Sequence, residues 1–284
     1  MKNKRSPLGS FEFTPGTFIL KGFRGFILLW RQMSISSAFF VLYLKAKTEE
    51  ITVPSFLEDI NKFYGTGEKN SKGQSLEEFL EEYDPYKYKN PCCTTDAVVF
   101  SYKDELKKDL SGLKVLMVKR SNHPSIGHWA LPGGFIELKE NLEDTARREL
   151  EEETGVKDIA VEQFAVYGDV TRDPRARIIT TAYMSLVKED DVKVQAGDDA
   201  ADAVWCDISL LKASMENDGE YVCDTYKLSV KNESRGLDTC ATVVHKMRKG
   251  IIREEKYIVD DKDVIACDHA ALMVQAYLLL KSRI

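Results

Sequence analysis

The sequence predicts an α/β protein built around one acidic helix. Residues 142–154 place apolar side chains every fourth position and stop at Gly155, a residue that commonly ends helices. A strand-like stretch with a glycine pair precedes this segment, and the apolar run 156–166 follows it. The order strand, glycine loop, helix and new apolar run indicates the α/β class.

The remaining elements are assigned from periodicity and turn residues. Ser75 and Glu78 have the spacing of a capping box, which predicts a short helix over residues 75–83. One amphipathic helix is expected over residues 267–284, and His269 is interpreted as a contact at its N-terminal end, with a metal role left open. Strand-like runs are predicted at residues 92–100 and 113–119, after the turn around Pro174 within 167–187, and within 221–258.

Composition limits the class of protein. The chain has 284 residues, a net charge of −6 and 43% hydrophobic residues, which disfavours a general nucleic-acid binder and leaves room for one large domain with an extension. Its six cysteines show no CxxC pairing and are interpreted as reduced thiols of a cytoplasmic protein.

The acidic helix separates into two faces when about 100° is allotted to each residue. Leu142, Ala146 and Leu150 form an apolar stripe that must face a core. A second set of side chains lies away from that stripe and is expected to be solvated: Glu143, Asp144, Arg147 and Glu151.

Glu149, Glu152 and Glu153 fall beside the apolar stripe, where solubility does not require them. Their i, i+3, i+4 spacing brings three carboxylates to one side of one turn, where they repel one another unless a cation neutralises them. Hard oxygen ligands of this kind suit Mg²⁺, for which Mn²⁺ may substitute. The spacing therefore predicts a divalent-metal site, and an ordinary solvated helix face is the alternative.

The segment around this helix resembles the Nudix box, the signature of hydrolases that act on nucleoside diphosphates linked to another moiety. Before the helix, Gly133 and Gly134 allow tight backbone bends close to a ligand. The fixed positions of the box are all filled, by Gly134, Glu140, Arg148, Glu149, Leu150, Glu152, Glu153, Gly155 and Val156. The resemblance implies an α/β/α sandwich with a mixed sheet, here with an inserted β-hairpin near the C-terminus.

The resemblance also implies roles for individual residues. The three glutamates match the family's metal ligands, and Glu149 matches the position credited with helping to activate water. Gly133 matches the position whose carbonyl often supplies a further metal ligand. Arg148 and Glu140 match the pair that braces the loop against the helix. The candidate catalytic residues are therefore Arg148, Glu149, Glu152 and Glu153.

Arginines outside the box are candidates for binding the substrate. Arg172, Arg175 and Arg177 cluster around Pro174, where guanidinium groups could hold phosphate oxygens; a charged hairpin is the alternative. The phrase GDVTRDPRAR and residues 115–135 resemble the Nudix branch that binds or hydrolyses ADP-ribose. The substrate-binding candidates are Arg120, Arg172, Arg175 and Trp129, which could stack on a base, although a place in the core is the favoured interpretation of Trp129.

The resemblance leads to a predicted reaction: Mg²⁺-dependent hydrolysis of ADP-ribose, or a related nucleoside diphosphate derivative, to AMP and a sugar phosphate. Enzymes of this kind are commonly homodimers, so the resemblance implies a homodimer here. The same branch includes regulators of NAD metabolism that sense ADP-ribose and bind DNA through a winged helix. Residues 222–284 carry 11 Lys and Arg against 9 Asp and Glu, a weak basis for a DNA footprint, so the regulator is kept as the alternative.

Three regions are expected along the chain: an apolar extension at residues 1–50, a helical and linker segment at 51–84, and the Nudix domain at 85–284. Within the extension, the longest uncharged run is 13 residues, from Gln32 to Leu44, too short to span a bilayer. Three interpretations stay open: a packing element, an interfacial membrane anchor, or an extension upstream of a true start such as Met33.

Overall fold

The computed structural model describes residues 11–14, 17–20, 56–57, 59–197, 200–252 and 254–284. The chain divides into two compact units, Met1–Tyr88 and Lys89–Ile284. Strands β1 (Phe11–Thr14) and β2 (Thr17–Leu20) pair antiparallel in the first unit. Most of the apolar N-terminal segment lies outside the described residues, so its three interpretations stay predictions.

The rest of the first unit contains a 3-10 turn, η1 (Asn61–Phe63), and helix α2 (Leu76–Glu82). Ser75 caps the helix, because its hydroxyl accepts the Glu78 N–H at 3.2 Å. The Glu78 carboxylate in turn accepts the Ser75 N–H at 2.7 Å. This reciprocal pair is the capping box that the sequence predicts.

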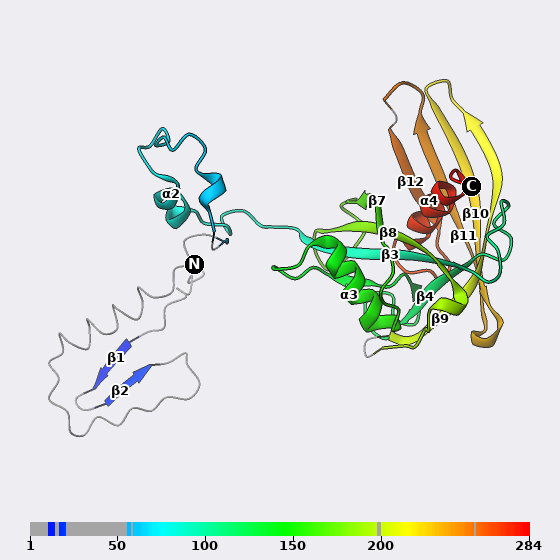
Figure 1. Cartoon of the computed structure of the whole chain (residues 1–284), viewed down its shortest axis with the longest axis horizontal. Coiled ribbons are helices and arrows are strands. Elements are labelled where there is room, and N and C mark those ends of the chain that lie inside the picture. Colours follow the sequence, from blue (N-terminus) through cyan, green and yellow to red (C-terminus); the bar gives the residue numbers. More distant parts are fainter. Residues whose placement is uncertain (1–10, 15–16, 21–55, 58, 198–199, 253) are drawn as a thin grey trace, which may run out of the picture. The chain divides into compact units, whose positions relative to one another are not determined.

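The second unit is built on one mixed sheet with the strand order β12-β11-β10-β9-β4-β3-β8-β7 (Figure 1). Strands β3 and β8 run parallel, and the other neighbours along this order are antiparallel. Two short strands pair at the side, β5 with β4 and β6 with β3. The strands are β3 (Cys92–Tyr102), β4 (Lys114–Arg120), β5 (Trp129–Ala130), β6 (Gly133–Phe135), β7 (Glu162–Tyr167), β8 (Ile178–Lys188), β9 (Ala200–Asn217), β10 (Tyr221–Asn232), β11 (Leu237–Arg248) and β12 (Glu255–Asp261).

Two helices cover opposite faces of this sheet. Along β3, Ala97 and Val99 pack into the cluster that contains Leu150 of α3 (Leu142–Thr154). The alternate residues Val98 and Phe100 pack into the cluster that contains α4 (His269–Lys281). Because successive strand residues point to opposite faces, the two helices lie on either side of β3. This confirms the α/β/α sandwich.

Helix α4 differs from the amphipathic helix expected from the sequence, and that expectation is wrong. No residue from His269 to Leu280 is exposed. The helix contacts β3 as well as β10, β11 and β12, so sheet strands cover more than one of its sides. A helix buried on most sides is apolar around its circumference, as the sequence HAALMVQAYLLLK is.

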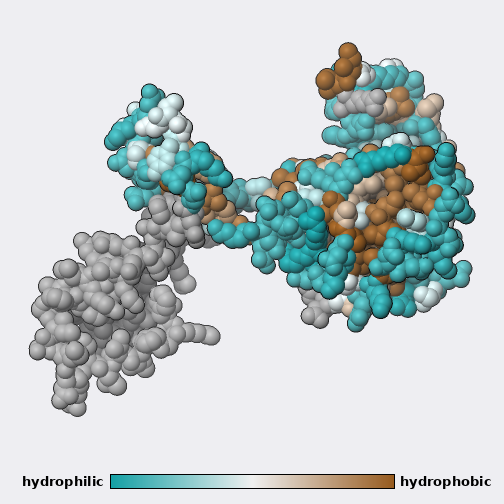
Figure 2. Space-filling view, viewed as in Figure 1, coloured by the Kyte–Doolittle hydropathy of each residue, from teal (hydrophilic) through white to brown (hydrophobic). Residues whose placement is uncertain are grey.

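Strands β9 to β12 form an antiparallel meander, which contains the hairpin expected near the C-terminus. The basic cluster His245–Lys249 lies on β11 and in the turn after it, not on a helix. Two isoleucines in that turn, Ile251 and Ile252, are 100% and 83% exposed. On the visible face of this unit, hydrophobic residues gather in a central area that hydrophilic residues surround (Figure 2). None of the helices in the described residues is both long and apolar enough to cross a membrane.

The burial of α4 gives the first testable prediction. Leu272 is fully buried, so Leu272→Ala removes packing atoms and should lower the free energy of unfolding by about 2–5 kcal/mol. Thermal or urea unfolding of the purified chain measures this change. Lys281→Ala, at the exposed end of the same helix, is the matched control and should leave stability nearly unchanged. An equally small effect at Leu272 would mean that α4 does not belong to the core.

Candidate active site

The glycine pair before α3 allows the helix to approach the sheet closely. Strand β6 pairs with β3, so that Gly133 lies opposite Asp96 and Gly134 opposite Thr95. A Cβ atom on Gly133 would collide with the Thr95 carbonyl oxygen, and one on Gly134 would overlap the Glu149 carboxylate. The backbone therefore excludes a side chain at Gly133, whereas a side chain at Gly134 would push the Glu149 carboxylate away from the loop.

Arg148 ties the loop to the helix through all three guanidinium nitrogens. Its Nε and Nη2 donate to the Glu140 carboxylate at 2.8 and 3.1 Å, and Nη2 also donates to the Phe135 carbonyl at 3.1 Å. Its Nη1 donates to Glu149 at 2.7 Å and to Glu152 at 2.9 Å. The hydrogen bond from Arg148 lowers the pKa of Glu140, so this ion pair persists over a wide pH range.

Glu149 and Glu153 are the two partly buried carboxylates of α3. Burial raises the pKa of both groups, and that of Glu153 reaches about 7. The Gly133 N–H donates to Glu153 at 2.9 Å and opposes this shift, whereas the charges of Glu149 and Asp96 add to it. The Arg120 charge offsets only part of the effect. Negative charge thus gathers at this end of the helix without a full counter-charge.

Glu152 does not join these two carboxylates. Its side chain is 58% exposed and is paired with Arg148, and it does not line the neighbouring pocket. The described residues contain no group of three or more acidic, histidine or cysteine side chains arranged to hold a metal ion. The structure therefore brings together two of the three expected glutamates. The four side chains expected to be solvated are all exposed: Glu143, Asp144, Arg147 and Glu151.

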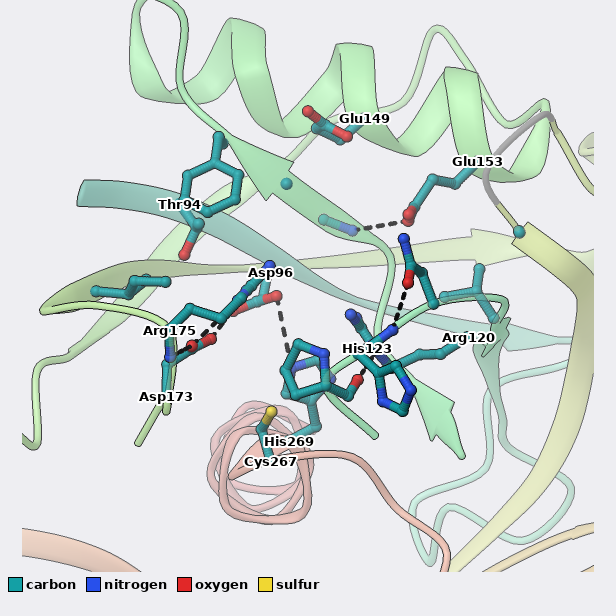
Figure 3. Close-up of a pocket in the computed structure, with 18 of the residues that line it drawn as sticks. Thr94, Asp96, Arg120, His123, Glu149, Glu153, Asp173, Arg175, Cys267 and His269 are labelled. Carbon is teal, nitrogen blue, oxygen red and sulfur yellow. Dashed lines mark hydrogen bonds and ion pairs between the residues drawn. The ribbon is translucent and has the colours of Figure 1, made fainter. Parts of the chain in front are cut away.

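A pocket of about 410 Å³ opens beside these carboxylates (Figure 3). Glu149 and Glu153 reach it from α3, and His269 reaches it from the opposite side at the start of α4. Gly133 and Gly134 form part of its lining between these two helices. The pocket thus combines elements that are far apart in the sequence.

Cationic side chains also line the pocket. Arg120 is the last residue of β4, and its Nε donates to the Pro124 carbonyl at 2.7 Å. Arg175 is 44% exposed, pairs with Asp173 at 2.9 Å and lies 5.4 Å from the centre of the Phe135 ring. An exposed guanidinium of this kind has donors left for a phosphate group. Both residues thus line the pocket, and their role in substrate binding stays a prediction.

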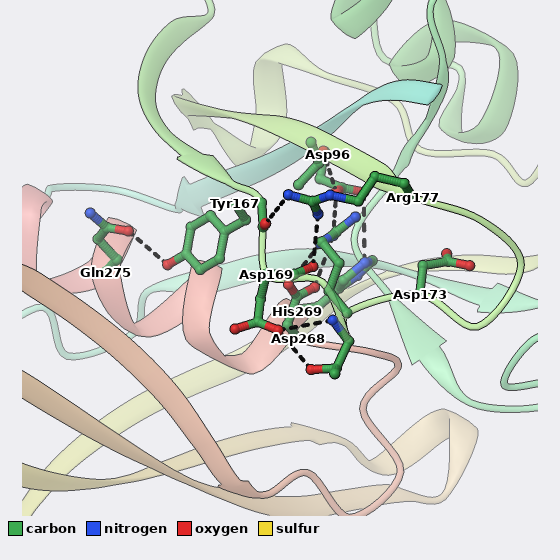
Figure 4. Close-up of polar contacts among 12 residues, drawn as sticks. Asp96, Tyr167, Asp169, Asp173, Arg177, Asp268, His269 and Gln275 are labelled. Atoms are coloured by element: carbon green, nitrogen blue, oxygen red, sulfur yellow. Dashed lines mark hydrogen bonds and ion pairs between the residues drawn. The ribbon is translucent and has the colours of Figure 1, made fainter. Parts of the chain in front are cut away.

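The other two arginines of the cluster have different surroundings. Arg172 lines the pocket, but its side chain is only 5% exposed and forms two hydrogen bonds of 2.9 Å with Asp268. Arg177 donates to the carbonyls of Gly168 and Asp169, so it holds the turn before β8 (Figure 4). Their guanidinium groups are therefore engaged with the protein itself.

Asp96 and Asp268 complete a buried polar cluster around Arg172 that the sequence does not predict. Asp96 accepts the Thr180 hydroxyl at 2.7 Å and lies 3.6 Å from Arg172. The partners come from β3, the loop before β8 and the start of α4, so no spacing rule connects them. One signal was available: Asp96 is the single charged residue in the β3 sequence CCTTDAVVFSY.

Trp129 lies in the core instead of the pocket. It is 5% exposed, belongs to the cluster that contains α4, and is not a pocket-lining residue. Its backbone bridges to Ile265, which fastens the segment before α4 to β5. The position agrees with the core alternative and gives no support to stacking on a base.

A family comparison agrees with this arrangement of loop, helix and sheet. The model of the NUDIX domain matches residues 78–224. The chain belongs to the NUDIX family. The match ends early in β10, so α4 and most of the meander lie beyond it.

Two of the similar proteins carry ADP-ribose in their names. An ADPR responsive transcriptional repressor, NtrR, of Acinetobacter baylyi is 38% identical over 115 residues, which are 40% of this chain and 44% of that protein. An ADP-ribose pyrophosphatase of Methanocaldococcus jannaschii is 40% identical over 98 residues, which are 34% of this chain and 57% of that protein. The chain thus spans about half the length of these relatives.

A solved structure extends the similarity beyond the family match. A MutT/nudix family protein from Enterococcus faecalis aligns with a TM-score of 0.50 and 29% identity, covering 74% of this chain and 70% of its own. The fold is therefore shared over most of the chain.

The contrast between two arginines gives a prediction about stability. Arg172→Ala leaves Asp96 and Asp268 buried without their cation and should lower the free energy of unfolding by about 3–5 kcal/mol. Arg147→Ala, the control, removes an exposed pair with Asp144 and should cost about 0–1 kcal/mol. Urea unfolding of both variants tests this difference. Equal stability losses would contradict the placement of Arg172 in a buried cluster.

Proposed function

We propose that this chain hydrolyses the diphosphate bond of ADP-ribose, or of a related nucleoside diphosphate derivative, to AMP and a sugar phosphate. One observation carries the proposal: Glu149 and Glu153, partly buried and adjacent, line a pocket that also holds Arg120 and Arg175. Carboxylates for a divalent cation and guanidinium groups for phosphate oxygens are the groups that diphosphate hydrolysis requires. The ADP-ribose pyrophosphatase among the relatives supports the substrate class.

The residues at the pocket fit a divalent cation. Burial and the neighbouring charges of Glu149 and Asp96 raise the pKa of Glu153, which means that this site lacks positive charge. Glu149 and Glu153 would hold Mg²⁺, or Mn²⁺ in its place, together with the Gly133 carbonyl. Glu152 would become a further ligand if its carboxylate gave up its hydrogen bond to Arg148. When bound, such an ion neutralises the diphosphate and makes attack by water easier.

The chain's own groups then act on the water and the substrate. A Glu149 carboxylate oxygen is proposed to accept a proton from the attacking water. Arg148 holds that carboxylate in place through its 2.7 Å hydrogen bond. Arg175 and Arg120 would bind phosphate oxygens from the other wall of the pocket.

The similarity to NtrR favours a second candidate function, in which the chain senses ADP-ribose and regulates transcription with little or no hydrolysis. In the C-terminal residues described, 221–252 and 254–284, strands β10 to β12 precede the single buried helix α4. A helix buried in the core cannot enter the major groove as a recognition helix. Hydrolysis is therefore preferred, while the homodimer and the cytoplasmic location stay predictions.

Replacing Glu149 tests the hydrolytic role. Glu149→Gln keeps the side-chain size but removes the proton acceptor, and kcat for ADP-ribose with Mg²⁺ should fall by about 100-fold or more. Glu151→Gln is the matched control, because Glu151 is an exposed glutamate on the same helix. Chromatography of the products over time gives the rate of product formation for both variants. Similar losses in the two variants would show that the effect comes from helix charge and not from the site.

Gel-shift titration tests the regulator. Full-length chain is titrated at moderate salt against DNA from the region upstream of its own gene, with and without ADP-ribose. Hydrolysis without regulation predicts weak binding that is insensitive to DNA sequence and to ADP-ribose. Tight, sequence-specific binding that ADP-ribose changes would instead establish the second candidate.

A further inference from the structure

His269 lines the pocket, and one of its ring nitrogens is held as a hydrogen-bond donor. The residue begins α4, is 6% exposed and lies beyond the family match. Its Nδ1 accepts the Leu131 backbone N–H at 2.8 Å. A ring nitrogen that accepts a hydrogen bond carries no proton, so the proton of the neutral ring sits on Nε2. The backbone thus fixes Nε2–H as a donor.

Asp96 places an acceptor next to this donor. Its Oδ2 accepts the Thr180 hydroxyl at 2.7 Å and faces Arg172 at 3.6 Å. Its Oδ1 lies 3.6 Å from His269 Nε2, which is too long for a hydrogen bond between them. The two atoms are therefore close to each other, but they do not form a hydrogen bond with each other (Figure 3).

Both residues line the same pocket as Glu149 and Glu153. A hydroxyl group can accept from one neighbour and donate to another through a single oxygen. An N–H donor beside a carboxylate acceptor therefore matches one hydroxyl group. A phosphate oxygen fits less well, because it would be repelled by the Asp96 charge.

We propose that His269 and Asp96 together bind a hydroxyl of the sugar on the far side of the diphosphate, and so select sugar-linked substrates. This inference rests on the proposed function. The two residues position the sugar end of the substrate, and neither takes part in the reaction with water. The C-terminal helix thereby contributes to specificity, although it lies outside the matched NUDIX domain.

The surroundings of the pair favour the sugar over the adenine base. Arg172, Asp173 and Asp268 surround this end of the pocket or contact its cluster, and they are charged. A base needs a flat apolar or aromatic surface. The Phe135 ring supplies such a surface elsewhere in the pocket lining, with Arg175 stacked near it.

Two substitutions separate the two nitrogens of His269. In His269→Asn, the amide oxygen can replace Nδ1 as the acceptor for Leu131, but the Nε2 donor is lost. In His269→Gln, the amide nitrogen can replace Nε2, but the Nδ1 acceptor is lost. If His269 acts only through its hydrogen bond to Leu131, the His269→Gln variant should lose more affinity for the ligand. If the Nε2 donor binds the sugar, the His269→Asn variant should lose more affinity.

Binding is measured by calorimetry with Mg²⁺ and two methylene-bridged ligands that resist hydrolysis. One is the analogue of ADP-ribose, and the other is the analogue of ADP methyl ester, which keeps the diphosphate but has no second sugar. His269→Asn should weaken binding of the first about five- to tenfold, the loss of one hydrogen bond, and leave the second unchanged. His269→Gln should bind the first ligand within about twofold of wild type.

Other outcomes are decisive as well. Equal weakening of both ligands by His269→Asn, or no weakening, would overturn the inference. If the wild-type chain binds neither ligand, the proposed function is contradicted, and the inference about His269 and Asp96 falls with it. A test that needs no variant uses three ADP-ribose analogues, each lacking one terminal-ribose hydroxyl: one must lose about five- to tenfold in affinity, and equal affinities would also overturn the inference.

Discussion

The site depends on the hydrogen bonds that the Arg148 guanidinium donates to both the loop and the helix. It binds Glu140 and the Phe135 carbonyl on the loop side, and Glu149 and Glu152 on the helix side. The glycine pair before α3 lets the loop backbone approach β3 and the Glu149 carboxylate closely. The direction of the Glu149 carboxylate into the pocket follows from this contact.

A second constraint closes the opposite side of the pocket. Asp96, Arg172 and Asp268 join the central strand, the turn before β8 and the start of α4 into one buried cluster. Charges this deep are tolerated only when they are paired and hydrogen-bonded, so the three segments must keep their relative positions. The C-terminal helix is thereby held at the pocket, and His269 with it.

The sequence was sufficient where function depends on local spacing. The solvated set of side chains on α3, the capping box at Ser75 and the glycine that ends the helix follow from positions a few residues apart, and the structure confirms them. It was insufficient where a distant partner decides. Arg172 is 96 residues from Asp268, so its pairing could not be read from its neighbours, and burial of α4 depends on strands that surround it. Glu152, which was expected beside Glu149 and Glu153, pairs with Arg148 and stays largely exposed outside the pocket.

One measurement tests the central claim most directly. Purified chain is incubated with ADP-ribose and Mg²⁺ in water enriched in oxygen-18, and the products are identified by mass spectrometry, with Glu153→Gln alongside. Hydrolysis at the diphosphate predicts AMP and ribose 5-phosphate, one of which carries a single heavy oxygen on its phosphate, and a strong reduction in the variant. Tight binding of ADP-ribose by the wild-type chain with no product would contradict the hydrolase and indicate a sensor.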